Sequence, residues 1–137
     1  MTNPIINPII RADDRQLWYI DNKLHREDGP AIVYDDGTQE WWVDGRRHRE
    51  GGPAYIDGDG SQAWYVDDKL HHEDGPAFIY DDGTQEWYID GELHRIDGPA
   101  IIYPDGSQAW YIDGEQIKEK DFEKAVRLYH CKMVLES

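Results

Sequence analysis

The sequence predicts an all-β protein, an elongated single-layer antiparallel sheet of tandem 23-residue β-hairpin repeats with a C-terminal capping α-helix. Two observations predict this fold, and both concern spacing. A tryptophan recurs every 23 residues, at Trp18, Trp41, Trp64, Trp87 and Trp110. A histidine keeps the same interval and is followed each time by Gly-Pro-Ala, at His25, His48, His71 and His94. A large ring and a rigid turn in fixed register indicate one small unit that is copied and stacked.

Each unit contains two strand patterns. The first covers residues 31–34, 77–80 and 100–103, and the second surrounds the tryptophan, as in residues 39–43 and 85–89. Both are rich in β-branched and aromatic residues. An Asp-Gly pair between them supplies the positive φ that a hairpin turn requires, and a second Asp-Gly pair is expected to end the second strand. Two strands in 23 residues leave no room for helical crossovers, so neighbouring strands should pair antiparallel.

Side-chain alternation assigns the residues of the second strand to two faces. Trp41 and Val43 should lie on one face, and Glu40 and Trp42 on the other. The tryptophan series is therefore expected to form a ladder along one face, as the spine of the core. An aromatic platform for a ligand is the less favoured interpretation of the same series.

The pattern divides the chain into three parts: an extended N-terminal arm at 1–15, a repeat domain of about 4.5 repeats at 16–116, and a capping helix at 117–137. Asn-Pro-Ile-Ile occurs twice in the arm, and proline every four residues excludes a helix there. The arm is expected either to cover the sheet edge as a strand or to be disordered. From about Lys118 to Val134, apolar residues follow helical spacing, at Phe122, Ala125, Val126, Tyr129 and Met133.

Charge and composition restrict the function. The net charge is −15, with 29 acidic against 14 basic residues, and it lies within residues 1–114. Such a field repels nucleic acid and anionic lipid and attracts basic surfaces, although solubility alone explains it equally well. The sequence shows neither a long apolar run nor the features of a signal peptide. The single cysteine, Cys131, has no partner for an internal disulfide, so a cytoplasmic location is expected.

The repeat resembles a known family. Leu-His-Arg-Glu-Asp-Gly-Pro-Ala at 24–31 and Leu-His-Arg-Ile-Asp-Gly-Pro-Ala at 93–100 stand beside a Trp-Tyr-x-Asp-Gly core with a 23-residue period. This pattern is similar to MORN repeats (membrane occupation and recognition nexus), in a divergent form found in phages and large viruses. The resemblance covers about residues 16–114. It implies elongated antiparallel sheets that act as scaffolds or binding surfaces, without enzyme activity. The third unit departs from the pattern at His72 and the second at Gly51, so contacts between units should differ there.

The candidates for metal chemistry are weak. The repeated histidines would lie ~10 Å apart in a stack, too far to share one metal. They are expected instead to tie the turn together by donating to an aspartate or a backbone carbonyl. His71 and His72 with Glu73 and Asp74 form the best local cluster, but adjacent strand residues point to opposite faces. Residues 57–61 hint at a calcium loop, yet lack its glycine and glutamate at the required positions. No catalytic residue, metal or cofactor is therefore expected.

The leading hypothesis is a non-enzymatic acidic scaffold that binds a protein partner with a basic surface. Given the resemblance, it would be virus-encoded and would block a host protein in the host cytoplasm, such as a defence or nucleic-acid-processing protein. The alternatives are a DNA mimic that occupies a basic groove and a small-ligand binder that uses the aromatic face. No direct binding to nucleic acid or membrane is expected, and open sheet edges would allow a homodimer. The proposed acidic contacts are Glu73, Asp74, Asp81, Asp82, Glu86, Asp90, Glu92, Asp57 and Asp59, and the proposed aromatic anchors are Trp42, Tyr65 and Tyr88.

Overall fold

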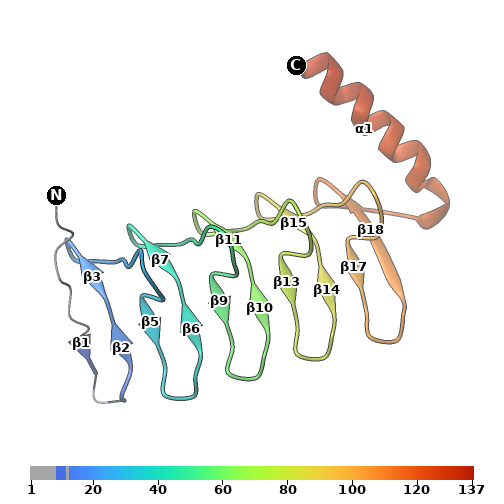
Figure 1. Cartoon of the computed structure of the whole chain (residues 1–137). Helices are drawn as coiled ribbons and strands as arrows, with labels where there is room; N and C mark the ends of the chain where they lie inside the picture. The colour runs from blue at the N-terminus through green and yellow to red at the C-terminus, as the bar shows by residue number, and fades with distance from the viewer. Residues whose placement is uncertain (1–8, 12) are drawn as a thin grey trace.

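The chain forms a ribbon of β-hairpins that stand side by side, with one helix at the C-terminal end (Figure 1). The computed structural model describes residues 9–11 and 13–137, so residues 1–8 and 12 of the predicted arm lie outside the described residues. Within the described part, one antiparallel sheet of eleven strands runs the length of the ribbon, which confirms the predicted fold class. In spatial order its strands are β1 (Ile9–Ile10), β2 (Gln16–Leu17), β5 (Ile32–Val33), β6 (Gln39–Glu40), β9 (Tyr55–Ile56), β10 (Gln62–Ala63), β13 (Phe78–Ile79), β14 (Gln85–Glu86), β17 (Ile101–Ile102), β18 (Gln108–Ile112) and β19 (Glu115–Ile117).

A second series of short hairpins lies above the long sheet in Figure 1. We call the hairpins of the long sheet, such as β5–β6, the lower hairpins, and those of the second series the upper hairpins. In the described residues the upper hairpins are β3 (Tyr19–Ile20) with β4 (Lys23–Leu24), β7 (Trp42–Val43) with β8 (Arg46–Arg47), β11 (Tyr65–Val66) with β12 (Lys69–Leu70), and β15 (Tyr88–Ile89) with β16 (Glu92–Leu93). In the first four units the predicted second strand is therefore interrupted at the tryptophan, whereas in the last unit β18 runs through Trp110.

The upper hairpins correct one prediction. The second Asp-Gly pair was expected to end a strand, but Asp44 and Gly45 are the turn of the hairpin β7–β8, with φ of 51° and 76°. Both residues adopt the left-handed conformation that a tight two-residue turn requires. The returning strand, β8, consists of two arginines and has no apolar alternation. Because sequence patterns detect strands through that alternation, the return strand was missed.

The register of the long sheet separates its two faces, since paired residues point to the same side. One face alternates glutamine with β-branched residues. The other face carries most of the buried side chains of the sheet and forms the core, with Leu17, Ile32, Glu40, Tyr55, Ala63, Phe78, Glu86, Ile101 and Ala109.

The tryptophans form a regular row, but they are not the most buried part of the molecule. Their backbone N–H groups donate to the carbonyls of the repeated alanines, at Trp18–Ala31, Trp41–Ala54, Trp64–Ala77 and Trp87–Ala100. These four alanines are 0% exposed, whereas only Trp18, at 8%, is buried among the five tryptophans. The predicted spine of indole rings is thus a row of half-buried rings that alternate with fully buried alanines.

The C-terminal helix covers the last unit. A short 3₁₀ turn at Glu119–Asp121 leads into α1 (Phe122–Glu136), close to the predicted bounds. The ring of Phe122 lies 6.4 Å from that of Trp110, and the ring of Tyr129 lies 5.2 Å from that of His94. Met133, predicted on the same face, is 37% exposed, because the helix leaves the sheet before it ends (Figure 1). None of the helices in the described residues is long and apolar enough to cross a bilayer.

Candidate binding surfaces

The predicted acidic contacts lie at two edges of the ribbon rather than on one face. Asp57, Asp59, Asp81 and Asp82 occupy the turns of the lower hairpins, which line one edge in Figure 1. Four others lie in or next to the upper hairpins: Glu73, Asp74, Asp90 and Glu92. All eight are exposed except Asp57, which is half-buried.

The carboxylates of the lower turns are held in place by backbone donors. Oδ1 of Asp36 accepts the backbone N–H of Thr38 at 2.8 Å, and Asp82 accepts that of Thr84 at the same distance. These hydrogen bonds hold the pKa of Asp36 and of Asp82 below the ordinary value, because they favour the charged form. The side chain of Asp57 accepts the N–H of Asp59 at 2.9 Å. In the lower edge, the carboxylates of Asp36, Asp57 and Asp82 are therefore oriented by backbone donors.

Successive lower turns are also joined to one another. The backbone N–H of Gly58 donates to the hydroxyl of Thr38 at 3.1 Å, and that of Asp81 donates to the hydroxyl of Ser61 at 3.0 Å. Equivalent positions two strands apart are separated by ~10 Å in a β-sheet. The row of carboxylates thus has a regular spacing that the turns themselves maintain.

Glu86, the ninth predicted contact, lies on the core face. Its carboxylate is half-buried and accepts a hydrogen bond from the hydroxyl of Tyr88 at 2.8 Å. The equivalent Glu40, two units earlier, is only 3% exposed. Its carboxylate accepts hydrogen bonds from Arg47 at 2.7 Å and from the hydroxyl of Tyr34 at 2.8 Å. Sequence reasoning missed the ion pair between buried Glu40 and half-buried Arg47, although alternation had placed Glu40 on the same face as Trp42.

The predicted aromatic anchors lie on the same side as these glutamates. Trp42, Tyr65 and Tyr88 are all half-buried. The guanidinium of Arg47 lies 5.2 Å from the ring centroid of Trp42 and 5.4 Å from that of Tyr65. Burial, followed by the hydrogen bond to Glu86, raises the pKa of Tyr88 well above its ordinary value. The anchors therefore present neutral aromatic surface that is only partly open to solvent.

The repeated histidines link each unit to the next. Nδ1 of His25 accepts the backbone N–H of Asp44 at 3.0 Å, and the same bond recurs at His48–Asp67, His71–Asp90 and His94–Asp113. The histidines were expected to donate to an aspartate or a carbonyl, whereas here the backbone N–H of the aspartate is the donor; the same Nδ1 of His25 also lies 3.2 Å from Oδ1 of Asp44. Nε2 faces a glutamate in the first three units, with His25 and Glu27 at 3.3 Å. Across the described residues, no three His, Cys, Asp or Glu side chains are placed to hold a metal ion.

A row of cations stacked on the tryptophans was not foreseen. The guanidinium carbons of Arg26, Arg49 and Arg95 each lie 4.0 Å from the ring centroid of the tryptophan eight residues earlier. In the third unit His72 stacks on Trp64, with centroids 4.7 Å apart. The sequence contains a signal for this stacking, because each arginine follows its tryptophan by the same number of residues. The arginine follows the histidine whose backbone N–H bonds the tryptophan carbonyl across the upper hairpin, so the interval marks a contact only once that hairpin is known.

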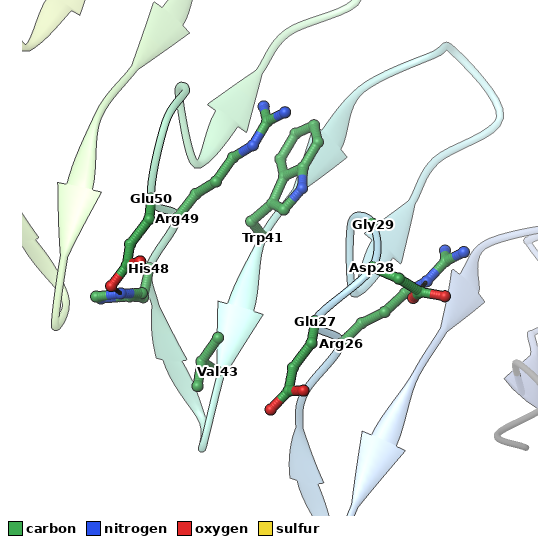
Figure 2. A pocket seen from close by; sticks show the side chains of 9 residues that line it. All are labelled: Arg26, Glu27, Asp28, Gly29, Trp41, Val43, His48, Arg49 and Glu50. Atoms are coloured by element: carbon green, nitrogen blue, oxygen red, sulfur yellow. Dashed lines mark hydrogen bonds and ion pairs between the residues drawn. The ribbon is translucent and has the colours of Figure 1, made fainter. Parts of the chain in front are cut away.

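One pocket lies between the first and second of these units. It has a volume of about 710 Å³ and is shown in Figure 2. Its lining mixes both signs of charge and one aromatic ring, from Arg26, Glu27, Asp28, Gly29, Trp41, Val43, His48, Arg49 and Glu50. Such a pocket suits a polar ligand better than an apolar one.

No protein-family model matches the chain, and no curated protein matches it.

Proposed function

We propose that the protein is a non-enzymatic scaffold that binds a protein partner with a basic surface. The observation that carries this proposal is the row of carboxylates in the lower turns, three of which, Asp36, Asp57 and Asp82, are oriented by backbone N–H groups. A fixed charge loses little conformational freedom on binding, so electrostatic complementarity is gained at a smaller entropic cost.

The distribution of charge favours the centre of the ribbon as the place where the partner binds. Residues 71–93 contain seven acidic side chains and no lysine or arginine. On the lower edge, Asp57 and Asp59 belong to one turn and Asp81 and Asp82 to the next. A partner with basic side chains spaced along an extended surface would meet both turns at once.

The half-buried aromatic rings would add neutral contacts. Trp42, Tyr65 and Tyr88 lie on the core side of the ribbon and remain partly open. Aromatic residues commonly supply most of the binding energy at the centre of an interface, while surrounding charges steer the encounter. The resemblance to viral repeat proteins adds that the partner is a host protein whose activity the scaffold blocks.

Two matched variants test the proposal. The first replaces four lower-edge carboxylates, at Asp57, Asp59, Asp81 and Asp82, with asparagine, which retains an acceptor oxygen for the turn bonds. The second removes four charges from the upper side, as Glu73→Gln, Asp74→Asn, Asp90→Asn and Glu92→Gln. Immobilised wild-type protein should capture a specific protein from an extract of the native host, the lower-edge variant should lose it, and the upper-side variant should retain it. Equal capture by both variants would contradict the lower-edge assignment.

The salt dependence of capture separates the DNA-mimic alternative from the scaffold. A mimic that displaces counterions from a basic groove should lose affinity steeply as salt rises, by about a thousandfold or more between low and physiological salt. A scaffold with aromatic contacts should lose much less. Displacement of the partner from DNA by the protein would further favour the mimic.

A further inference from the structure

Three arginines share one pose in the first, second and fourth units. Arg26, Arg49 and Arg95 each stack on a tryptophan at 4.0 Å. Nη1 of each also donates to a proline carbonyl, at 3.1 Å for Pro30, 3.0 Å for Pro53 and 3.0 Å for Pro99. The ring and the carbonyl together hold each guanidinium in a fixed orientation.

The second copy lacks the carboxylate that the other two copies have. Nε of Arg26 donates to Asp28 at 2.9 Å, and Nε of Arg95 donates to Asp97 at 3.0 Å. Gly51 stands at the equivalent position beside Arg49, and no described carboxylate pairs with that guanidinium. A β-carbon at Gly51 would meet no atom within 4 Å, so open space lies next to the residue that replaces the aspartate.

Arg49 also lines the pocket of about 710 Å³ between the first and second units (Figure 2). The carboxylates of Glu27, Asp28 and Glu50 line the same pocket. They disfavour a doubly charged phosphate more than a singly charged group. The edge of a guanidinium matches the two oxygens of a carboxylate, which is the group that the other two copies already hold.

We propose that this pocket binds a carboxylate at Arg49, in the role that Asp28 and Asp97 play in their own units. The ligand bears the carboxylate as a side chain, as a peptide C-terminus or as a small organic acid. Because Trp41 and Pro53 already fix the guanidinium, little ordering is required when the ligand binds. This site is distinct from the proposed scaffold function, since it takes a group of the opposite charge.

Arginine Nε–Hε signals in ¹⁵N-labelled protein provide the test. Sodium acetate should shift the Arg49 signal saturably, compared with sodium chloride at equal ionic strength, while Arg26 and Arg95 should respond weakly because their Nε groups are already paired. Gly51→Asp should supply the missing carboxylate and weaken the acetate response at least about tenfold. Gly51→Asn is the matched control. It has the same tolerance for the positive φ of 80° but no charge, and should retain the response.

Equal responses to acetate and chloride, equal responses at all three arginines, or an unchanged response in Gly51→Asp would each overturn the proposal. If Gly51→Asp fails to fold, Arg49→Lys gives a second test, read at the Gly51 amide. The lysine loses the fork geometry and should abolish the acetate shift, whereas an unchanged shift overturns the site. Comparing N-acetylglycine, an N-acetyl-aspartate amide and succinate assigns the source of the carboxylate by the tightest binding, and binding by none of them contradicts the proposal.

Discussion

Nδ1 of His25 accepts the backbone N–H of Asp44 at 3.0 Å, and this bond joins the loop of one unit to the upper hairpin of the next. Three further histidines repeat it. His25 is buried and Asp44 is exposed, so the bond lies at the boundary between the interior and solvent. The histidine period in the sequence is therefore explained by contacts between units.

Replacing this acceptor should loosen the contact between the first two units. His25→Leu should lower the free energy of unfolding by about 0.5–1.5 kcal/mol, because the bond is lost while the N–H of the exposed Asp44 can bond water. His25→Asn should cost less, because its side-chain oxygen can accept the same bond. Chemical denaturation gives the stabilities, and hydrogen exchange at the Asp44 amide reports the bond itself. Unchanged exchange at Asp44 in His25→Leu would show that the bond contributes nothing.

The pair of buried Glu40 and half-buried Arg47 should behave as a coupled unit. Arg47→Met leaves the nearly inaccessible carboxylate of Glu40 without its cation, and the free energy of unfolding should fall by about 2–3 kcal/mol, less than for a fully buried pair. Adding Glu40→Gln should recover part of this loss. A double-mutant cycle measured by urea unfolding checks the prediction, and simple additivity of the two single changes would refute it.

Alkaline pH should weaken the fold through half-buried tyrosines such as Tyr55. Burial, followed by the hydrogen bond to Asp57, raises the pKa of Tyr55 to about 12. The folded state therefore holds this proton more tightly than the unfolded state, so the stabilisation is complete below pH 10 and is lost as the pH rises toward 12. Absorbance at alkaline pH should show a late-ionising component that Tyr55→Phe reduces. An unchanged late-ionising component in Tyr55→Phe would exclude Tyr55 as its source.

The capping helix should stabilise the fold mainly through the contacts of its first turn. Phe122→Ala removes the ring next to Trp110, and the free energy of unfolding should fall by about 1.5–3 kcal/mol, less than for a fully buried phenylalanine. Leu128→Ala, at a position that is 60% exposed, should change it by less than about 0.5 kcal/mol. Thermal and denaturant unfolding of both variants provide the measurement. Equal effects would mean that the helix does not act as a cap.

Periodic residues predicted most of this fold. Trp41 and the glycines of the turns identified the units, and the spacing of Phe122 and Tyr129 identified the helix face that meets the last unit. The return strand Arg46–Arg47 could not be found in the same way, because a two-residue strand of charged side chains leaves no periodic signal.

The surfaces were less predictable than the fold. The exposure of aspartates such as Asp81 follows from their place in Asp-Gly turns. The sequence does not predict that Glu86 is half-buried while Glu92 is exposed. Composition cannot distinguish a carboxylate that accepts a tyrosine hydroxyl from one that lies in an upper hairpin. The stacking of Arg49 on Trp41 follows from the upper hairpin that pairs His48 with Trp41, and the return strand of that hairpin leaves no periodic signal.

Scalar couplings across hydrogen bonds test the central claim most directly, namely that successive 23-residue units stack in one register. Stacking in one register predicts couplings from the tryptophan N–H groups to the carbonyls of the repeated alanines, at Trp18–Ala31, Trp41–Ala54, Trp64–Ala77 and Trp87–Ala100. Couplings from these N–H groups to other carbonyls, or a different partner in each unit, would contradict it.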